Sequence, residues 1–174
     1  MLWVKQKQSG FTIVELLIVI VVIAILAAIT IVAYNGIQNR ASDAAVQSDL
    51  RSLAIRFQEY YHTNQSYPRG GSATSAFTDF PASQVSRNAY LPNTNNIYYC
   101  VGTIDGVERL GLAAKSRSGT AWMFSSTTGA ITTHTGSWGS SGAPCTGTGV
   151  PTTTADFFYK FGVWNTNVWN AWIQ

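Results

Sequence analysis

One carboxylate lies where an acid is costly. The stretch "SGFTIVELLIVIVVIAILAAIT", residues 9–30, contains Glu15 as its single charged side chain. An ionised group in an apolar membrane segment costs free energy unless a cation neutralises it. An acid kept at this position therefore indicates a function, and the chemistry it offers is pairing with a positive charge supplied by another group.

The sequence predicts no enzyme, no metal site and no cofactor. His62 is expected at a helix end and His134 in a Thr-rich strand, and neither has an acid at catalytic spacing. No glycine-rich phosphate loop follows a predicted strand, and no His/Cys cluster has metal-ligand spacing. The formal net charge is +3 and the arginines are dispersed, so nothing indicates tight binding to a nucleic acid duplex, although DNA uptake stays open.

Two cysteines, Cys100 and Cys145, lie outside the apolar stretch. In an exported domain an even pair predicts one disulfide, and the alternative is two buried free thiols. A bridge would close a loop of about 45 residues, for which the chain-entropy model gives roughly 4 kcal/mol.

The chain's last residues are rich in aromatic side chains. The stretch "FFYKFGVWNTNVWNAWIQ" predicts a final hairpin that turns at Asn165–Asn167, with its rings covering the sheet or the helix. The alternative is an exposed patch for a glycan or a neighbouring subunit, and its candidate surface-binding residues are Trp164, Trp169 and Trp172.

Three interpretations fit the apolar run from Phe11 to Ala33, which is long enough to cross a bilayer as a helix. It is a secretory signal cut after Ala33, an uncut single-span anchor, or a segment preceded by a leader cut after Gly10. The basic residues Lys5 and Lys7 precede it, which favours an N-terminus in the cytoplasm. Only the third interpretation gives Glu15 a purpose, because the acid then lies at the fifth position of the mature chain.

Helical periodicity continues beyond the apolar run. Val46, Leu50, Leu53, Phe57 and Tyr60 recur at steps of four and three, which indicates the apolar face of an amphipathic helix. The polar residues between them are expected to form a solvated or subunit-facing surface: Gln38, Arg40, Asp43, Gln47, Asp49, Arg51, Arg56 and Gln58. A helix reaching about His62 would be roughly 78 Å long, more than a domain of this size buries but suitable for a fibre.

The remaining residues predict a loop and then a sheet, so the fold class is α+β, with a long N-terminal helix packed on an antiparallel sheet head. Strand-like runs follow Ile97 and are separated by Asp105–Gly106, Ser118–Gly119 and Thr128–Gly129. Residues 136–156 are expected to be an extended surface segment. The predicted boundaries are a leader over 1–10, a membrane or fibre-core helix over 11–34, an amphipathic helix over 35–63, a loop over 64–96 and the head over 97–174.

The residues "GFTIVELL" resemble the processing site of type IV pilins and the related pseudopilins. That family has a short basic leader ending in Gly, then Phe, a few small or apolar residues, Glu and a long apolar helix. The resemblance implies that a prepilin peptidase cuts between Gly10 and Phe11 and that Phe11 is then N-methylated. It also implies an assembly role for Thr12 and Glu15, the acid pairing with the free N-terminal amine of a neighbouring subunit.

By this resemblance the protein is expected to be a structural subunit of a type IV pilus-like filament that serves attachment, twitching motility or DNA uptake. Its expected partners are further copies of itself, the peptidase, a membrane assembly platform and, before assembly, lipid of the cytoplasmic membrane. The precursor would be a single-pass membrane protein with its N-terminus inside, and the assembled pilus would be extracellular. The alternatives are a pseudopilin of a type II secretion system and a membrane-anchored glycan-binding module.

The sequence departs from familiar pilins inside the apolar helix. Many members carry helix-perturbing Gly and Pro there, whereas the matching positions hold Ala24 and Val32. The helix is therefore expected to remain continuous or to loosen only near Gly36.

Overall fold

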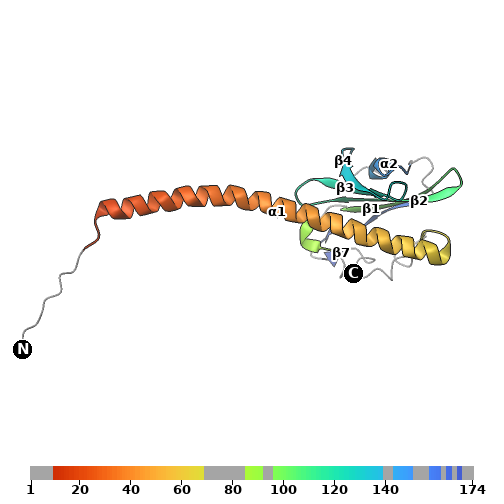
Figure 1. Ribbon diagram of the computed structural model, residues 1–174, viewed down its shortest axis with the longest axis horizontal. Helices are drawn as coiled ribbons and strands as arrows, with labels where there is room; N and C mark the ends of the chain where they lie inside the picture. The colour runs from red at the N-terminus through yellow and green to blue at the C-terminus, as the bar shows by residue number, and fades with distance from the viewer. Residues whose placement is uncertain are drawn as a thin grey trace, which may run out of the picture. The chain divides into compact units, whose positions relative to one another are not determined.

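The computed structural model describes residues 10–68, 85–91, 96–138 and 143–150, together with the backbone of residues 157–161, 164–165 and 168–169. The chain divides into two compact units, residues 1–38 and 39–174. A long helix comes first and an antiparallel sheet follows it, so the α+β class predicted from the sequence is confirmed (Figure 1).

Helix α1 spans Ile13–Asn64 without interruption, and Gly36 lies inside it. The helix ends because Gln65 adopts a left-handed conformation, with φ of 58°, and its N–H donates to the Tyr61 carbonyl at 2.8 Å. The side chain of Asn64 also donates to the Tyr60 carbonyl at 2.9 Å. The apolar helix is continuous in the single chain, and whether it stays so in a filament remains a prediction.

The main sheet has five antiparallel strands in the order β4-β3-β2-β1-β5. Asp105 and Gly106 both have positive φ, as a two-residue hairpin between β1 and β2 requires. The first four strands form the predicted meander: β1 (Ile97–Ile104), β2 (Val107–Lys115), β3 (Ala121–Ser125) and β4 (Ile131–His134).

The C-terminal residues form more than the predicted hairpin. Strand β5, Phe157–Phe161, pairs with β1 and becomes an edge of the main sheet. The short strands β6 (Trp164–Asn165) and β7 (Val168–Trp169) then pair with each other as the expected final hairpin. The sequence interpretation places these residues in the final hairpin and does not predict their pairing with β1, because that contact joins residues far apart in the chain.

The core lies between α1 and one face of the sheet. Four helix side chains, Val46, Leu50, Leu53 and Phe57, are buried at the predicted helical spacing. They pack on alternate residues of the strands, because successive side chains of a strand point to opposite faces. The main strand contributors to this cluster are Ile97, Tyr99, Val101, Leu110, Leu112 and Phe124.

Two aspartates of α1 attach the helix to loops of the head. Asp49 accepts hydrogen bonds from the Ser86 N–H at 2.9 Å, the Ser86 hydroxyl at 3.1 Å and the Tyr90 hydroxyl at 2.8 Å. Asp43 accepts from the hydroxyls of Ser116 and Ser118 in the β2–β3 turn. The prediction of a solvated or subunit-facing surface is therefore wrong for these two residues. Asp49 is only 5 % exposed, because it flanks the apolar face and loop donors replace water around its carboxylate.

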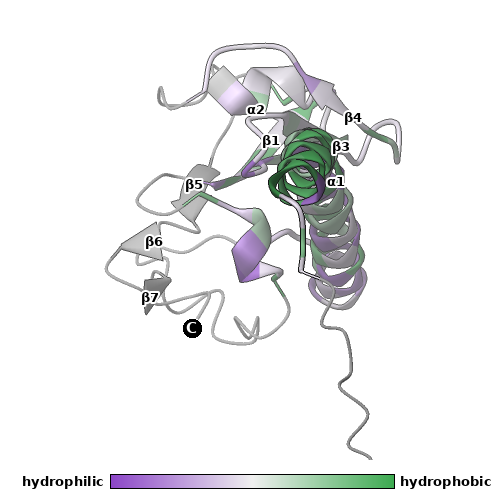
Figure 2. Cartoon of the chain, turned by 90° about the vertical axis from the view of Figure 1, so that its left-hand side faces the viewer, coloured by the Kyte–Doolittle hydropathy of each residue, from purple (hydrophilic) through white to green (hydrophobic). Residues whose placement is uncertain are grey.

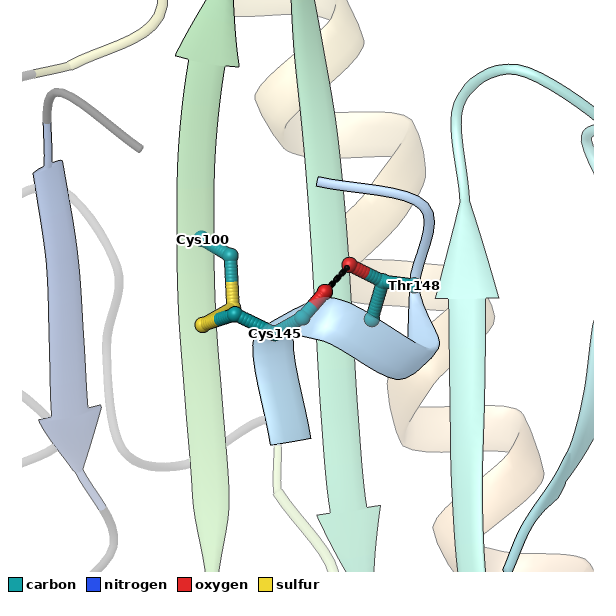
Figure 3. Close-up of a disulfide and its surroundings, with 3 residues drawn as sticks. All are labelled: Cys100, Cys145 and Thr148. Carbon is teal, nitrogen blue, oxygen red and sulfur yellow. Dashed lines mark hydrogen bonds between the residues drawn. A yellow bond between two sulfur atoms is a disulfide. The ribbon is translucent and has the colours of Figure 1, made fainter. Parts of the chain in front are cut away.

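A short helix covers the opposite face of the sheet, so the expectation of an extended segment is wrong for residues 143–147, while residues 139–142 and 151–156 lie outside the described residues. Helix α2 spans Ala143–Gly147, and Cys145 within it forms a disulfide with Cys100 of β1 (Figure 3). The bridge packs with Tyr98, Ala113 and Val150 in a second, smaller buried cluster. This second apolar face explains why the segment folds back rather than extending over the surface.

Asp49 gives the folded protein a specific pH dependence. Burial raises the pKa of Asp49, and the hydrogen bonds from Ser86 and Tyr90 offset only part of that rise. The folded state therefore binds a proton here more readily than the unfolded chain does. The stabilisation from this protonation is complete below the ordinary carboxyl pKa of 3.8 and is lost as the pH rises through the raised value.

We expect Asp49→Asn to remove this contribution. The difference in unfolding free energy between wild type and Asp49→Asn should therefore become less favourable to the wild type as the pH rises from about 3 to about 7. Urea denaturation of the full chain in detergent micelles measures this difference. If the wild type instead became more stable relative to Asp49→Asn as the pH rises across this range, the raised pKa of Asp49 would be contradicted.

Candidate functional site

The N-terminus of α1 is a reciprocal cap made by Thr12 and Glu15. The Thr12 N–H and hydroxyl donate to Oε2 of Glu15 at 2.9 Å and 2.7 Å, and the Glu15 N–H lies 3.3 Å from the Thr12 hydroxyl oxygen. This arrangement is a capping box, in which two side chains satisfy backbone N–H groups that lack a helical partner. The cap explains why the helix begins at Ile13.

The cap uses only one of the two carboxylate oxygens. Every hydrogen bond found for the Glu15 side chain within the described residues goes to Oε2, and the side chain is exposed. Oε1 is therefore available to a donor from another molecule. Glu15 can hold the start of its own helix and accept an external cation at the same time.

The surface that follows Glu15 is apolar on every side. Each large apolar side chain between Ile13 and Ile37 is at least 47 % exposed. Figure 2 shows this part of α1 in green, the colour of hydrophobic residues. By length and composition the helix contains a segment able to cross a membrane. A helix that is hydrophobic all round needs lipid or protein around it.

The other predicted site residues lie in different parts of the chain. Gly10 and Phe11 are exposed and directly precede the cap. Cys100 and Cys145 meet on the far face of the sheet from α1. The backbones of Trp164 and Trp169 pair across the β6–β7 hairpin. Trp172, like Lys5 and Lys7 of the predicted leader, lies outside the described residues.

The local role of Thr12 is missing from the sequence interpretation, although the signal is present. The residues "TIVE" match the capping-box pattern, in which Ser or Thr is followed three positions later by Glu or Gln. The family resemblance implies an assembly role for Thr12 but does not indicate this bond to Glu15. Among the described residues no group of His, Cys, Asp and Glu side chains could hold a metal ion.

Comparison with known proteins places this N-terminal arrangement in a family. The family profile described as the prokaryotic N-terminal methylation motif matches residues 5–31. The type IV wide pilus major component PilA4 of Thermus thermophilus is 40 % identical over 94 residues, which cover 49 % of this chain and 71 % of that protein. The chain belongs to the type IV pilin family.

Pseudopilin-type proteins are also similar to this pilin-family chain. The type II secretion system core protein G of Aeromonas hydrophila is 29 % identical over 86 residues, covering 49 % of this chain and 60 % of that protein. The protein of the same name from Klebsiella pneumoniae is 29 % identical over 85 residues, covering 49 % of this chain and 61 % of that protein. No solved structure matches the chain significantly.

In this pilin-family chain the Thr12 hydroxyl should hold the first helical turn. Thr12→Val removes the hydroxyl and keeps the shape of the side chain, whereas Thr12→Ser keeps the hydroxyl. Loss of such a cap costs about 1–2 kcal/mol. We therefore expect the first-turn amide hydrogens of Thr12→Val to exchange about 5–30 times faster than those of Thr12→Ser. Hydrogen exchange of the full chain in detergent micelles, read by mass spectrometry, measures the rates.

Thr30→Val is the matched control for this comparison. The Thr30 hydroxyl donates to the Ala27 carbonyl inside the same helix, at 2.9 Å, and makes no cap. This control should leave the first turn unchanged. Equal exchange rates in Thr12→Val and Thr12→Ser would rule out the hydroxyl as the element that holds the helix start.

Proposed function

We propose that the chain is a structural subunit of a type IV pilus-like filament, assembled through its N-terminal helix. The observation that carries this proposal is the combination of an all-round apolar helix with a carboxylate, Glu15, at its first turn. Lipid covers such a helix before assembly, and the helices of other copies cover it in a filament. Neither step requires catalytic residues.

In this proposal a prepilin peptidase removes residues 1–10, and Phe11 becomes the N-methylated first residue. Cleavage creates a positively charged amine one residue before the cap. Residues 11–34 then serve as the membrane segment and later as the fibre core. Residues 35–63 form the amphipathic half of the helix, residues 64–96 the connection to the sheet, and residues 97–174 the head.

Pairing between subunits would use the oxygen that the cap leaves available. Oε2 of Glu15 is held by Thr12, whereas Oε1 has no partner within the described residues. A neighbour's N-terminal amine bound there would neutralise the acid in apolar surroundings, where an unpaired charge is costly. This contact would stabilise one axial register of the helices, because the amine meets the acid in only one alignment of adjacent helices.

A pseudopilin of a type II secretion system is the second candidate, and the similarity to core protein G supports it. Such a subunit would be processed and assembled in the same way, into a short periplasmic fibre. The copy number in filaments sheared from intact cells distinguishes the two. A major pilus subunit dominates this fraction, whereas a pseudopilin or a minor pilin does not.

The mature N-terminus tests the processing step. We expect the intact mass of the membrane-extracted protein to correspond to residues 11–174 with one added methyl group. A chain that begins at Met1, or at Tyr34 after cleavage behind Ala33, would instead favour an uncut or a secreted binding module. The Gly10→Leu variant should retain the leader, because a bulky side chain then occupies the cleavage position.

Glu15→Gln tests the pairing step in cells that have this gene as their only copy. The amide is nearly the same size but carries no charge, so the neighbour's amine would be buried without a counter-ion. An unpaired charge in apolar surroundings is strongly destabilising, and we expect at least a tenfold loss of sheared filaments.

Thr30→Val, which alters a hydroxyl in the same helix and no charge, should assemble normally. The membrane content of each variant is measured alongside, so that loss of filaments is separated from loss of protein. Normal filaments built from correctly processed Glu15→Gln subunits would refute the pairing.

A further inference from the structure

We propose that a polar cleft on the α2 side of the sheet binds an acidic sugar residue of an extracellular polysaccharide. The cleft has a volume of about 420 Å³ and lies beside the last turn of α2. Its polar lining includes Asp105, Arg109, Ser125, Thr128, Thr132 and Thr148. All of these residues belong to the head, so the proposal does not depend on filament assembly.

The register of the sheet gathers this polar lining on one face. Leu110 of β2 and Phe124 of β3 belong to the core beneath α1. Side chains alternate along a strand, so Arg109 and Ser125, their direct neighbours, lie on the opposite face. Thr132 of β4 pairs with Met123 and joins them there. Three strands thus present polar groups to the side that α1 does not cover.

The end of α2 and the turn that follows it, residues 147–149, form one wall of the cleft, and close packing fixes this wall in place. Thr148 is buried, and its hydroxyl donates to the Cys145 carbonyl at 2.7 Å (Figure 3). A Cβ atom built on Gly111 of β2 would lie 1.9 Å from the Thr148 hydroxyl oxygen, so only glycine allows this approach. The Cys100–Cys145 bridge ties the same turn to β1. This wall is therefore rigid before any ligand arrives, which lowers the entropy cost of binding.

The two charged side chains of the cleft define the chemistry of its ligand. Arg109 is half-buried and Asp105 is exposed, and neither side chain makes a hydrogen bond or an ion pair with another described residue. A guanidinium group binds a carboxylate through two parallel hydrogen bonds. Asp105 accepts hydrogen bonds from hydroxyl groups, and its negative charge disfavours a doubly charged phosphate.

The rest of the lining matches a sugar ring. The hydroxyls of Ser125, Thr128 and Thr132 can each donate and accept, as ring hydroxyls do. Ile104 and Met123 supply apolar surface for the C–H face of a pyranose. A carboxylate, several hydroxyls and an apolar ring face occur together in a uronic acid. The described residues that line this cleft do not include the C-terminal tryptophans considered above.

Titration calorimetry of the full chain in detergent micelles tests the proposal, with trigalacturonate as the acidic probe and maltotriose as the neutral one. We expect trigalacturonate to bind at least tenfold more tightly than maltotriose. Arg109→Gln should weaken trigalacturonate binding at least tenfold and leave the weak maltotriose binding unchanged. Thr132→Val, a nearly isosteric change on an exposed strand position, should weaken both sugars about threefold.

Arg117→Gln is the matched control, because it removes the same charge from the β2–β3 turn outside the cleft. It should bind trigalacturonate like the wild type, and the thermal unfolding of every variant is recorded to verify folding. The proposal is overturned if the wild type binds neither sugar or binds both equally. It is also overturned if Arg109→Gln and Arg117→Gln weaken binding alike, or if hexa-aspartate competes as well as trigalacturonate, since either result would mean unspecific attraction of anions.

Discussion

The need to cover the apolar first half of α1 is the constraint on which the rest of this protein depends. The side chains between Ile13 and Ile37 are exposed all round the helix, and nothing among the described residues buries them. Water does not stabilise such a surface, and lipid or further copies of the chain do. Membrane storage and polymerisation are two solutions to the same physical problem, and a protein can exchange one for the other with little change in hydrophobic free energy.

If the exchange of lipid for protein is nearly neutral in hydrophobic free energy, the specificity for one alignment of adjacent helices must come from polar groups. In the proposed filament the capping box at Thr12 and Glu15 would supply such a group, because it stabilises the helix start and leaves a carboxylate oxygen available. Apolar side chains alone would allow helices to slide past one another, since dispersion contacts are similar in many registers. The proposed contact between Glu15 and a neighbour's amine would remove this degeneracy.

The apolar face of the second half of α1 is buried against the sheet of the same chain. Here the helical periodicity of the sequence was sufficient to predict which side chains are buried. Val46, Leu50 and Phe57 are buried as the spacing predicts, and the Asp105–Gly106 turn follows from residues that tolerate positive φ. The burial of Asp49 was not predictable from spacing. Its partners, Ser86 and Tyr90, are about forty residues away, and no local pattern reports so distant a donor.

Contacts between residues far apart in the chain also explain the other differences between the sequence-based predictions and the structure. Residues 143–147 are a helix because Cys145 meets a second apolar face, whose existence becomes evident only after the strands are paired. The polar cleft depends on the register between β2, β3 and β4, and on a glycine that admits Thr148. Helix α1, the turns and the motif at Glu15 are local properties of the chain, whereas α2 is not. The loops, the cleft and the fifth strand are products of tertiary contacts.

The position of the disulfide gives the strands of the sheet two different resistances to a pulling force. The bridge from Cys100 to Cys145 encloses β2, β3 and β4 in one covalent loop, whereas β5 comes later in the chain, outside that loop, and pairs with β1 through its backbone. A pull on the C-terminus would therefore peel β5 from the sheet edge before it disturbed the meander. The head carries a detachable strand beside a covalently closed body, so tension could expose one edge of β1 without unfolding the rest.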